Sequence, residues 1–239
     1  MSDIQTRTVP YDHAGTALEG WLASPAGDTP RPVVLLVHEW RGLGDHVRAR
    51  AEQIAGWGWH GFAVDVFGAG VRPTTIEDCS ANMMIYVNDR DLLRARLHAA
   101  LDWIRAQPGV DGTRVAILGF CFGGLASMEL ARSGADIKLA ASFHGNLSTR
   151  DPAEAQNIRC PVLACHGADD LLVTQDVVAG FEREMSEAGV DWTVVQFGGV
   201  MHSFTNPQAN DPGFGTVYDA GADRRAFGLL RQYLDDVFA

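Results

Sequence analysis

The sequence predicts an α/β fold in which helices cover both faces of a mostly parallel central sheet. Short apolar runs, such as residues 33–37 and 162–165, lack the apolar–polar alternation that marks a half-exposed strand. Between these runs lie longer segments whose apolar residues recur at the 3.6-residue spacing of a helix. The two kinds of segment alternate along the chain, and repeated β-then-α units favour a parallel sheet with right-handed crossovers.

Each element follows from its local pattern. Two strands, at residues 4–9 and 17–23, form a hairpin-like start before a turn-rich stretch at 24–32. Later strands are expected at 33–37, 62–67, 114–118, 137–143, 162–165 and 192–197. Helices with one apolar face are expected around 47–55, 93–104, 123–132, 177–188 and 226–234. Only fifteen residues, 146–160, separate Gly145 from Pro161, too few for a helical cap. We therefore expect residues 1–239 to form a single domain without a cap.

Composition limits the possible partners. Nineteen basic and 30 acidic residues give a net charge of −11, which disfavours nucleic acid and anionic membranes because both bind clustered Lys and Arg. The N-terminus lacks the apolar stretch of a secretory signal, and no apolar run approaches the ~20 residues of a spanning helix. We expect a cytoplasmic monomer or homodimer that acts on a small molecule.

The cysteines and histidines do not have metal-ligand spacing. The four cysteines, at positions 79, 121, 160 and 165, include no CxxC pair, and no HExxH pair occurs among the eight histidines. We therefore expect no metal and no cofactor, and cysteines that stay reduced. One of these cysteines has a sequence context that indicates chemistry.

Residues 119–124, Gly-Phe-Cys-Phe-Gly-Gly, follow the strand at 114–118 and open a helix. This is the form of the nucleophile elbow, G-x-S-x-G, with Cys121 in place of serine. Side chains at positions 119 and 123 would collide with the neighbouring strand and helix, and a helix N-terminus favours a thiolate. The alternative is a tightly packed turn in which Cys121 is a small buried apolar residue.

An acid and a histidine follow the last two strands. Asp170 lies after the strand at 162–165, and the G-x-x-D-x-x-V spacing selects it over Asp169. His202 follows the strand at 192–197 and completes the order nucleophile, acid, histidine that α/β-hydrolases share. Alone, the two residues would be explained as a helix cap and a structural loop histidine. His144 and His166 also follow strands and could line the site, but neither is among the predicted catalytic residues.

The segment after residues 33–37 carries His38, Glu39 and Trp40. Folds of this type place an oxyanion-hole donor here, so the backbone N–H groups of Trp40 and Phe122 are the predicted pair. An acid beside such a site is unusual. The alternative for Glu39 is a salt bridge to Arg41 or Arg72.

Taken together, these motifs resemble the dienelactone hydrolase family over nearly the whole chain, from about Ala17 to the last helix. The resemblance rests on Glu39-Trp40, the elbow at Cys121, the Asp170 loop and the His202-Ser-Phe segment. It implies a single-domain Cys-His-Asp hydrolase. It also implies that Glu39 pairs with the resting thiol and swings away when substrate binds.

One departure from the family pattern concerns the substrate. Members that bind the carboxylate of dienelactone carry an arginine four residues after the catalytic histidine, where this chain has Asn206. A second family arginine is expected within residues 77–85, which contain none. Trp40, Met84, Phe204 and Asn206 are the predicted substrate contacts. Small neutral esters or lactones are therefore the predicted substrates, unless Arg41 or Arg72 turns into the pocket.

Two other functions stay open at this point. The chain could be a non-hydrolytic member of the fold that binds a small ligand in the same pocket. It could also be a thiol redox or peroxide sensor at Cys121, although the sequence has no resolving cysteine next to it.

Overall fold

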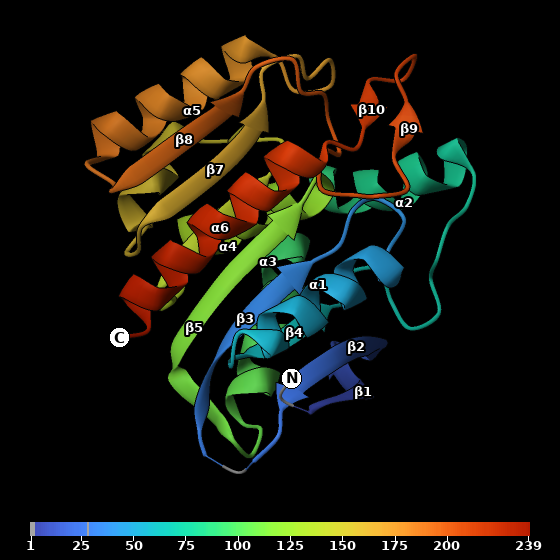
Figure 1. Ribbon diagram of the computed structural model, residues 1–239, viewed down its shortest axis with the longest axis vertical. Helices are drawn as coiled ribbons and strands as arrows, with labels where there is room; N and C mark the ends of the chain where they lie inside the picture. Colours follow the sequence, from blue (N-terminus) through green and yellow to red (C-terminus); the bar gives the residue numbers. More distant parts are fainter. Residues whose placement is uncertain (1–2, 28) are drawn as a thin grey trace. The chain divides into compact units, whose positions relative to one another are not determined.

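The computed structural model describes residues 3–27 and 29–239 and divides into two compact units, Met1–Ile117 and Leu118–Ala239 (Figure 1). Strand β5 (Val110–Phe120) contains the boundary between them. The single domain of residues 1–239 stays a prediction.

In the first unit, strands come before and after the first helix in the sequence. Its elements are β1 (Ile4–His13), β2 (Thr16–Pro25), β3 (Arg31–Val37), α1 (Asp45–Gly56), β4 (His60–Val64), α2 (Ile76–Asn88) and α3 (Arg90–Arg105). The strand order is β1-β2-β4-β3, followed by β5. Strands β1 and β2 form the predicted hairpin, β2 pairs antiparallel with β4, and β3 pairs parallel with β4.

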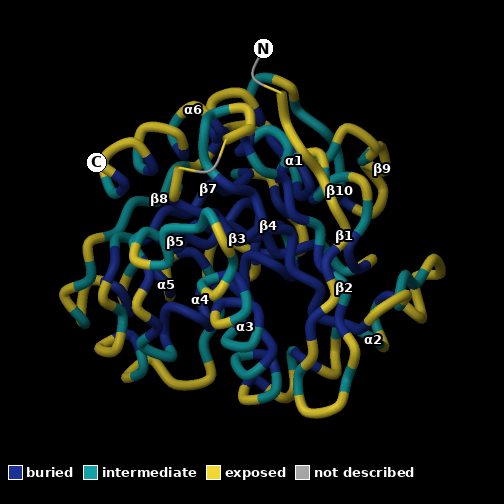
Figure 2. Tube along the Cα trace, turned by 90° about the horizontal axis from the view of Figure 1, so that it is seen from below, coloured by how far each residue is buried: buried dark blue, intermediate teal, exposed yellow. Residues whose placement is uncertain are grey.

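Strand β4 shows that helices cover both faces of this part of the sheet. A Cβ on Gly61 would overlap the backbone of Ala51, so this face lies against α1. The next residue, Phe62, stacks on Trp103 of α3 with ring centroids 5.2 Å apart. Because successive strand residues point to opposite faces, α1 and α3 cover opposite sides of β4. All five residues of β4 are buried, and the strand runs through the dark blue interior in Figure 2.

The second unit continues with parallel strands. Its elements are α4 (Phe122–Arg132), β6 (Leu139–Phe143), the short 3-10 helix η1 (Pro152–Asn157), β7 (Val162–Gly167), α5 (Gln175–Ala188), β8 (Trp192–Phe197), β9 (Asn210–Asp211), β10 (Thr216–Val217) and α6 (Ala220–Val237). From β5 the strand order is β6-β7-β8, and β7 pairs parallel with both β6 and β8. Strands β7 and β8 lie side by side next to α5 in Figure 1.

Strand β6 is also covered on both faces. The side chain of Ser142 lies where a Cβ on Gly124 of α4 would be, and the adjacent Phe143 packs on Phe227 of α6 at 5.2 Å. Within the described chain, only η1 interrupts the segment between β6 and β7, in agreement with the predicted lack of a cap. The prediction of a mostly parallel central sheet with helices is confirmed. No helix in ranges 3–27 and 29–239 is both long and apolar enough to cross a membrane.

Several element boundaries differ from the prediction, and two of the differences have a clear local cause. The strand expected at 62–67 ends at Val64, because the carboxylate of Asp65 accepts hydrogen bonds from the N–H groups of Phe67 and Gly68 and turns the chain. One helix is expected here, around residues 93–104, but the structure has two, α2 and α3, which are divided at Asp89, whose backbone leaves the helical region (φ −115°, ψ 85°). Its side chain accepts from the N–H of Leu92 and thereby caps α3.

Candidate active site

Cys121 lies between β5 and α4 in a backbone conformation that side chains rarely adopt. Its φ of 55° is in the left-handed region, which costs free energy for any residue except glycine. Its N–H donates to the carbonyl of Phe143 (3.1 Å), and its own carbonyl accepts from the N–H of Gly124 (3.0 Å). The surrounding backbone therefore holds the strained turn in place.

Glycines make this turn possible. A Cβ on Gly119 would overlap the carbonyl group of Gly123, which is the collision predicted for position 119. A Cβ on Gly124 would lie 2.6 Å from Cα of Gly145 and would also overlap the side chain of Ser142. The close approach of α4 to β6 thus needs Gly124, a requirement that the sequence pattern did not single out.

Asp170 and His202 form a buried hydrogen-bonded pair. Nδ1 of His202 lies 2.7 Å from Oδ2 of Asp170, and both residues are almost inaccessible to solvent. The other carboxylate oxygen, Oδ1, accepts from the N–H groups of Leu172 (2.8 Å) and Val173 (2.9 Å). The neighbouring Asp169 is exposed. The structure therefore pairs His202 with Asp170, the acid that the spacing selects.

The charges of this pair stabilise each other. Burial by itself would lower the pKa of His202, but the nearby Cys121 thiolate and the hydrogen bond to Asp170 outweigh it and raise the pKa to about 10. Burial would raise the pKa of Asp170, but the hydrogen bond and charge of His202 hold it below its usual value. Nε2 of His202 has no well-formed hydrogen bond to any described residue, so it is the nitrogen left to serve Cys121.

The backbone of His202 is also fixed. Its N–H donates to the carbonyl of Gly215, and its carbonyl accepts from the N–H of Val217, both at 3.0 Å. These two bonds hold the histidine against strand β10. The following residue, Ser203, has a φ of 58°, so the chain turns sharply just after the imidazole.

Cys121 differs from the other cysteines in accessibility. It is partly exposed, whereas Cys79, Cys160 and Cys165 are buried. Burial raises the pKa of the Cys160 thiol to about 12 and raises the pKa values of Cys79 and Cys165 as well. Those three thiols therefore stay protonated and unreactive at neutral pH.

In the first unit, Glu39 and Trp40 follow β3 as predicted. Oε2 of Glu39 lies 3.5 Å from Nδ1 of His46, an ion pair when that histidine is protonated. The two arginines predicted as alternative partners of Glu39 form hydrogen bonds with other groups. Nη1 of Arg41 donates to the carbonyl of Thr74 (2.8 Å), and Nε of Arg72 donates to that of Leu43 (2.7 Å).

The predicted substrate contacts have different surroundings. Met84 is exposed and Trp40 half-buried, as pocket-rim residues need to be. Phe204, however, is fully buried, because the turn at Ser203 directs its ring toward Phe197. Phe204 therefore has no surface accessible to a substrate in this structure, and its contact with substrate stays a prediction.

Asn206, the fourth predicted contact, is half-buried and takes part in a local turn. Its Oδ1 accepts from the N–H of Gln208 (3.0 Å), so the position of the family arginine is occupied by a short polar side chain.

Two further histidines lie near the pair. Nε2 of His166 lies 3.0 Å from the carbonyl oxygen of Val173, and burial lowers the pKa of this histidine. The ring of His144 packs against that of His202 with centroids 5.1 Å apart. The sequence left open that His144 lines the site, because it directly follows a parallel strand, where ligands bind in such sheets.

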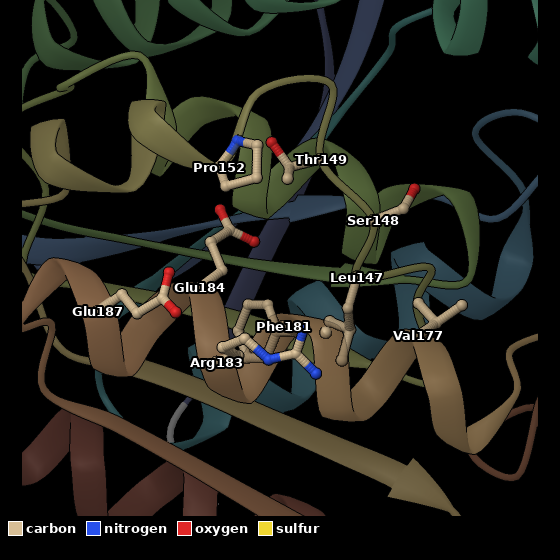
Figure 3. Close-up of a pocket in the computed structure, with 10 residues that line it drawn as sticks. Leu147, Ser148, Thr149, Pro152, Val177, Phe181, Arg183, Glu184 and Glu187 are labelled. Atoms are coloured by element: carbon tan, nitrogen blue, oxygen red, sulfur yellow. The ribbon is translucent and has the colours of Figure 1, made fainter.

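A pocket of about 510 Å³ lies between α5 and residues 147–152 (Figure 3). Phe181 and Glu184 of α5 point toward this segment, and the carboxylate of Glu184 accepts two hydrogen bonds of 2.8 Å from the buried Arg132. Neither Cys121, Asp170 nor His202 lines the pocket, so it is not the candidate active site.

The parallel sheet, the strained cysteine at a strand-to-helix turn and the buried Asp–His pair define the class of the α/β hydrolases. The chain belongs to the dienelactone hydrolase family, whose model matches residues 18–238. The protein is accordingly a hydrolase that acts on ester bonds.

Individual relatives agree with this membership. The structure of a dienelactone hydrolase-like promiscuous phosphotriesterase from metagenomic libraries has a TM-score of 0.94, covers 99% of both chains and is 36% identical. A protein of Aquifex aeolicus named "putative carboxymethylenebutenolidase" is 28% identical over 218 residues, which are 88% of this chain and 90% of that protein. A dienelactone hydrolase-type structure from Klebsiella pneumoniae, 22% identical with a TM-score of 0.84 over 98% of this chain and 99% of that one, shares the fold.

Proposed function

We propose that this hydrolase cleaves small, uncharged carboxylic esters or lactones by acyl transfer to Cys121. The observation that carries the proposal is the placement of His202. One ring nitrogen is bound to the buried carboxylate of Asp170, and the pKa of the ring is raised mainly by the Cys121 thiolate against the effect of burial. A histidine in this position can hold a proton for a leaving group and later remove one from water.

The reaction has two halves. The Cys121 thiolate attacks the carbonyl carbon, and the protonated His202 donates its proton to the departing alkoxide, which leaves a thioester and a neutral imidazole. Neutral His202 then takes a proton from water, and the resulting hydroxide attacks the thioester carbonyl. The carboxylic acid leaves, and the thiolate–imidazolium pair is restored. Asp170 keeps the imidazole in one tautomer throughout.

The backbone N–H groups of Trp40 and Phe122 are the proposed donors to the oxyanion, on the strength of their positions after β3 and Cys121. Phe122 is the first residue of α4, and the N–H groups of a first helical turn point out of the helix end. Glu39 is proposed to control the resting thiol. If so, Glu39→Gln changes the pH profile of Cys121 alkylation while the fold stays intact, and an unchanged profile returns Glu39 to a structural role.

The most direct test of this function is turnover of a panel of neutral esters, lactones and thioesters by Cys121→Ala. We expect a loss of at least about 10³-fold in kcat, because the nucleophile cannot be replaced by its neighbours. Cys165→Ala is the matched control: it removes a buried thiol and is expected to keep wild-type turnover of the folded protein. Near-normal activity in Cys121→Ala would contradict the proposal, and binding without any turnover in the wild type would favour the ligand-binding alternative.

Phosphotriesters are a second candidate substrate class. The observation that favours them is the 36% identical structure covering 99% of both chains, whose description is a promiscuous phosphotriesterase. A phosphotriester is neutral, as the proposed carboxylic esters are, and has the same need for a nucleophile and an oxyanion site. The same pair of variants decides whether any such turnover depends on Cys121.

A further inference from the structure

His144 is a fully buried histidine for which the proposed reaction has no step. It follows β6 with a φ of 43°, so the backbone accepts a conformation that is unfavourable for any residue except glycine. The N–H of His144 donates to the carbonyl of Cys165 at 2.8 Å, which ties this strained residue to β7. Strain that is held in place by surrounding bonds is frequent near functional sites.

Three contacts of the His144 ring lie along the segment that carries His202, and the ring also lies 6.1 Å from that of Phe120. The His144 ring packs edge-to-face on His202, with centroids 5.1 Å apart and an interplanar angle of 68°. It makes a similar contact with Phe204 at 5.2 Å and 79°. Its Nε2 lies 2.8 Å from the hydroxyl oxygen of Thr205, which is itself inaccessible to solvent. One ring thus contacts three of four consecutive residues of the turn.

The orientation of His202 needs such a contact. The bond from Nδ1 to Asp170 fixes one ring nitrogen but leaves the imidazole able to swing about that bond. Nε2, which interacts with the thiol of Cys121, would then move relative to that reacting group. A second ring packed edge-to-face on His202 removes this freedom.

The geometry points to His144 as a positioning residue that holds the His202 ring in the orientation needed to serve Asp170 and Cys121 together. The inference rests on the proposed function, because it assigns His144 to the same reaction. Ordinary core packing would be served equally well by phenylalanine. The ring contact with His202 therefore predicts that turnover depends on a ring being present at position 144. The bond to Thr205 explains why that ring is a histidine and not an apolar one.

Two substitutions separate the ring contact from stability. His144→Asn removes the ring and keeps a side chain that tolerates positive φ. His144→Phe keeps the ring and loses the bond to Thr205. Phe181→Leu, in the buried part of α5, is the control for a loss of core packing. We measure kcat and KM with one neutral ester for each folded variant, together with thermal unfolding.

We expect His144→Asn to lower kcat by about 10- to 100-fold with KM changed less than about threefold, because the error is in orientation. His144→Phe should keep at least about a third of the wild-type kcat, and Phe181→Leu should lower only the melting temperature. An unchanged kcat in His144→Asn would overturn the inference, and so would a kcat in His144→Phe as low as that in His144→Asn.

NMR tests the positioning role of His144 even if the protein hydrolyses no ester. The Nδ1 proton that His202 shares with Asp170 should shift or broaden in His144→Asn and stay near its wild-type position in His144→Phe. An unchanged Nδ1 signal in His144→Asn would overturn the positioning role. Failure of the proposed function is a different result, namely wild-type protein with no turnover that depends on Cys121.

Discussion

The protonation of His202 depends on two neighbours, and this dependence is the main feature of the site at the scale of single residues. Burial disfavours the imidazolium, so its raised pKa must come from negative charge close by. The Cys121 thiolate is the larger of the raising influences, and the carboxylate of Asp170 adds to it. The raised pKa keeps the His202 imidazole protonated at neutral pH, ready to donate a proton to the leaving group in acyl transfer to sulfur.

Removal of the thiolate should lower the pKa of His202. In the wild type the protonated fraction of His202 falls as the pH rises through about 10. In Cys121→Ala burial still acts against the charge while the largest raising influence is gone, so this midpoint should move to lower pH. An NMR titration of the His202 ring measures it, with Cys165→Ala as the variant expected to keep the wild-type midpoint. A midpoint that does not move in Cys121→Ala would show that the thiolate does not raise the pKa of His202.

At the scale of elements, turns determine where the reactive groups lie. The elbow needs Gly119 and Gly124 because strand, helix and loop backbones approach there more closely than a Cβ allows. The turn after His202 needs the left-handed conformation of Ser203, and the turn after β4 needs the carboxylate of Asp65. Each helix or strand has a propensity of its own, but these short turns decide which way its terminal side chain points.

Gly119→Ala should damage the elbow. The added Cβ would overlap the carbonyl of Gly123, which belongs to the backbone and cannot rotate away, so we expect unfolding in urea to show a loss of about 1–3 kcal/mol or more. Gly228→Ala in α6 is the matched control, since nothing lies within 4 Å of its added Cβ. The control should gain about 0.5–1 kcal/mol from helix propensity. Equal stabilities of the two variants would contradict the packing account of the elbow.

The elements themselves could be predicted from periodicity, and the order of Cys121, Asp170 and His202 could be predicted because each follows its own strand. The direction of the side chains that follow a turn could not be predicted. Phe204 points inward since Ser203 adopts positive φ, a choice that no apolar pattern records. The division into α2 and α3 was not predicted either, because a single residue, Asp89, ends one helix and caps the next. The contact of His144 with His202 joins residues 58 positions apart, which local spacing does not reveal.

At the scale of the whole chain, charge favours neutral substrates. The net charge of −11 works against the approach of an anion, and a carboxylate left unpaired in a partly apolar site costs several kcal/mol. The two arginines that could replace a missing clamp are held by their own unit. Arg72 donates to carbonyls of Leu43 and Val71 at 2.7 Å each, and Arg41 donates to that of Thr74.

A lactone without a carboxylate should therefore have a higher kcat/KM than the same scaffold with one. The comparison uses matched substrates in the wild type, in Arg41→Ala and in Arg72→Ala, and we expect the preference to persist in both variants. The opposite result would be a wild-type preference for the carboxylate form that is lost in one of these variants. It would show that the arginine replaced in that variant leaves its carbonyl partners and binds the substrate.

The central claim is that substrate is attached to Cys121 during turnover, and rapid quench followed by mass spectrometry tests it most directly. Wild-type protein mixed with a slowly hydrolysed neutral ester should gain the mass of one acyl group, located on the peptide that contains Cys121. The adduct should be labile to hydroxylamine, as a thioester is, and absent from Cys121→Ala. Continued turnover without any adduct at Cys121, undiminished in Cys121→Ala, would contradict the account.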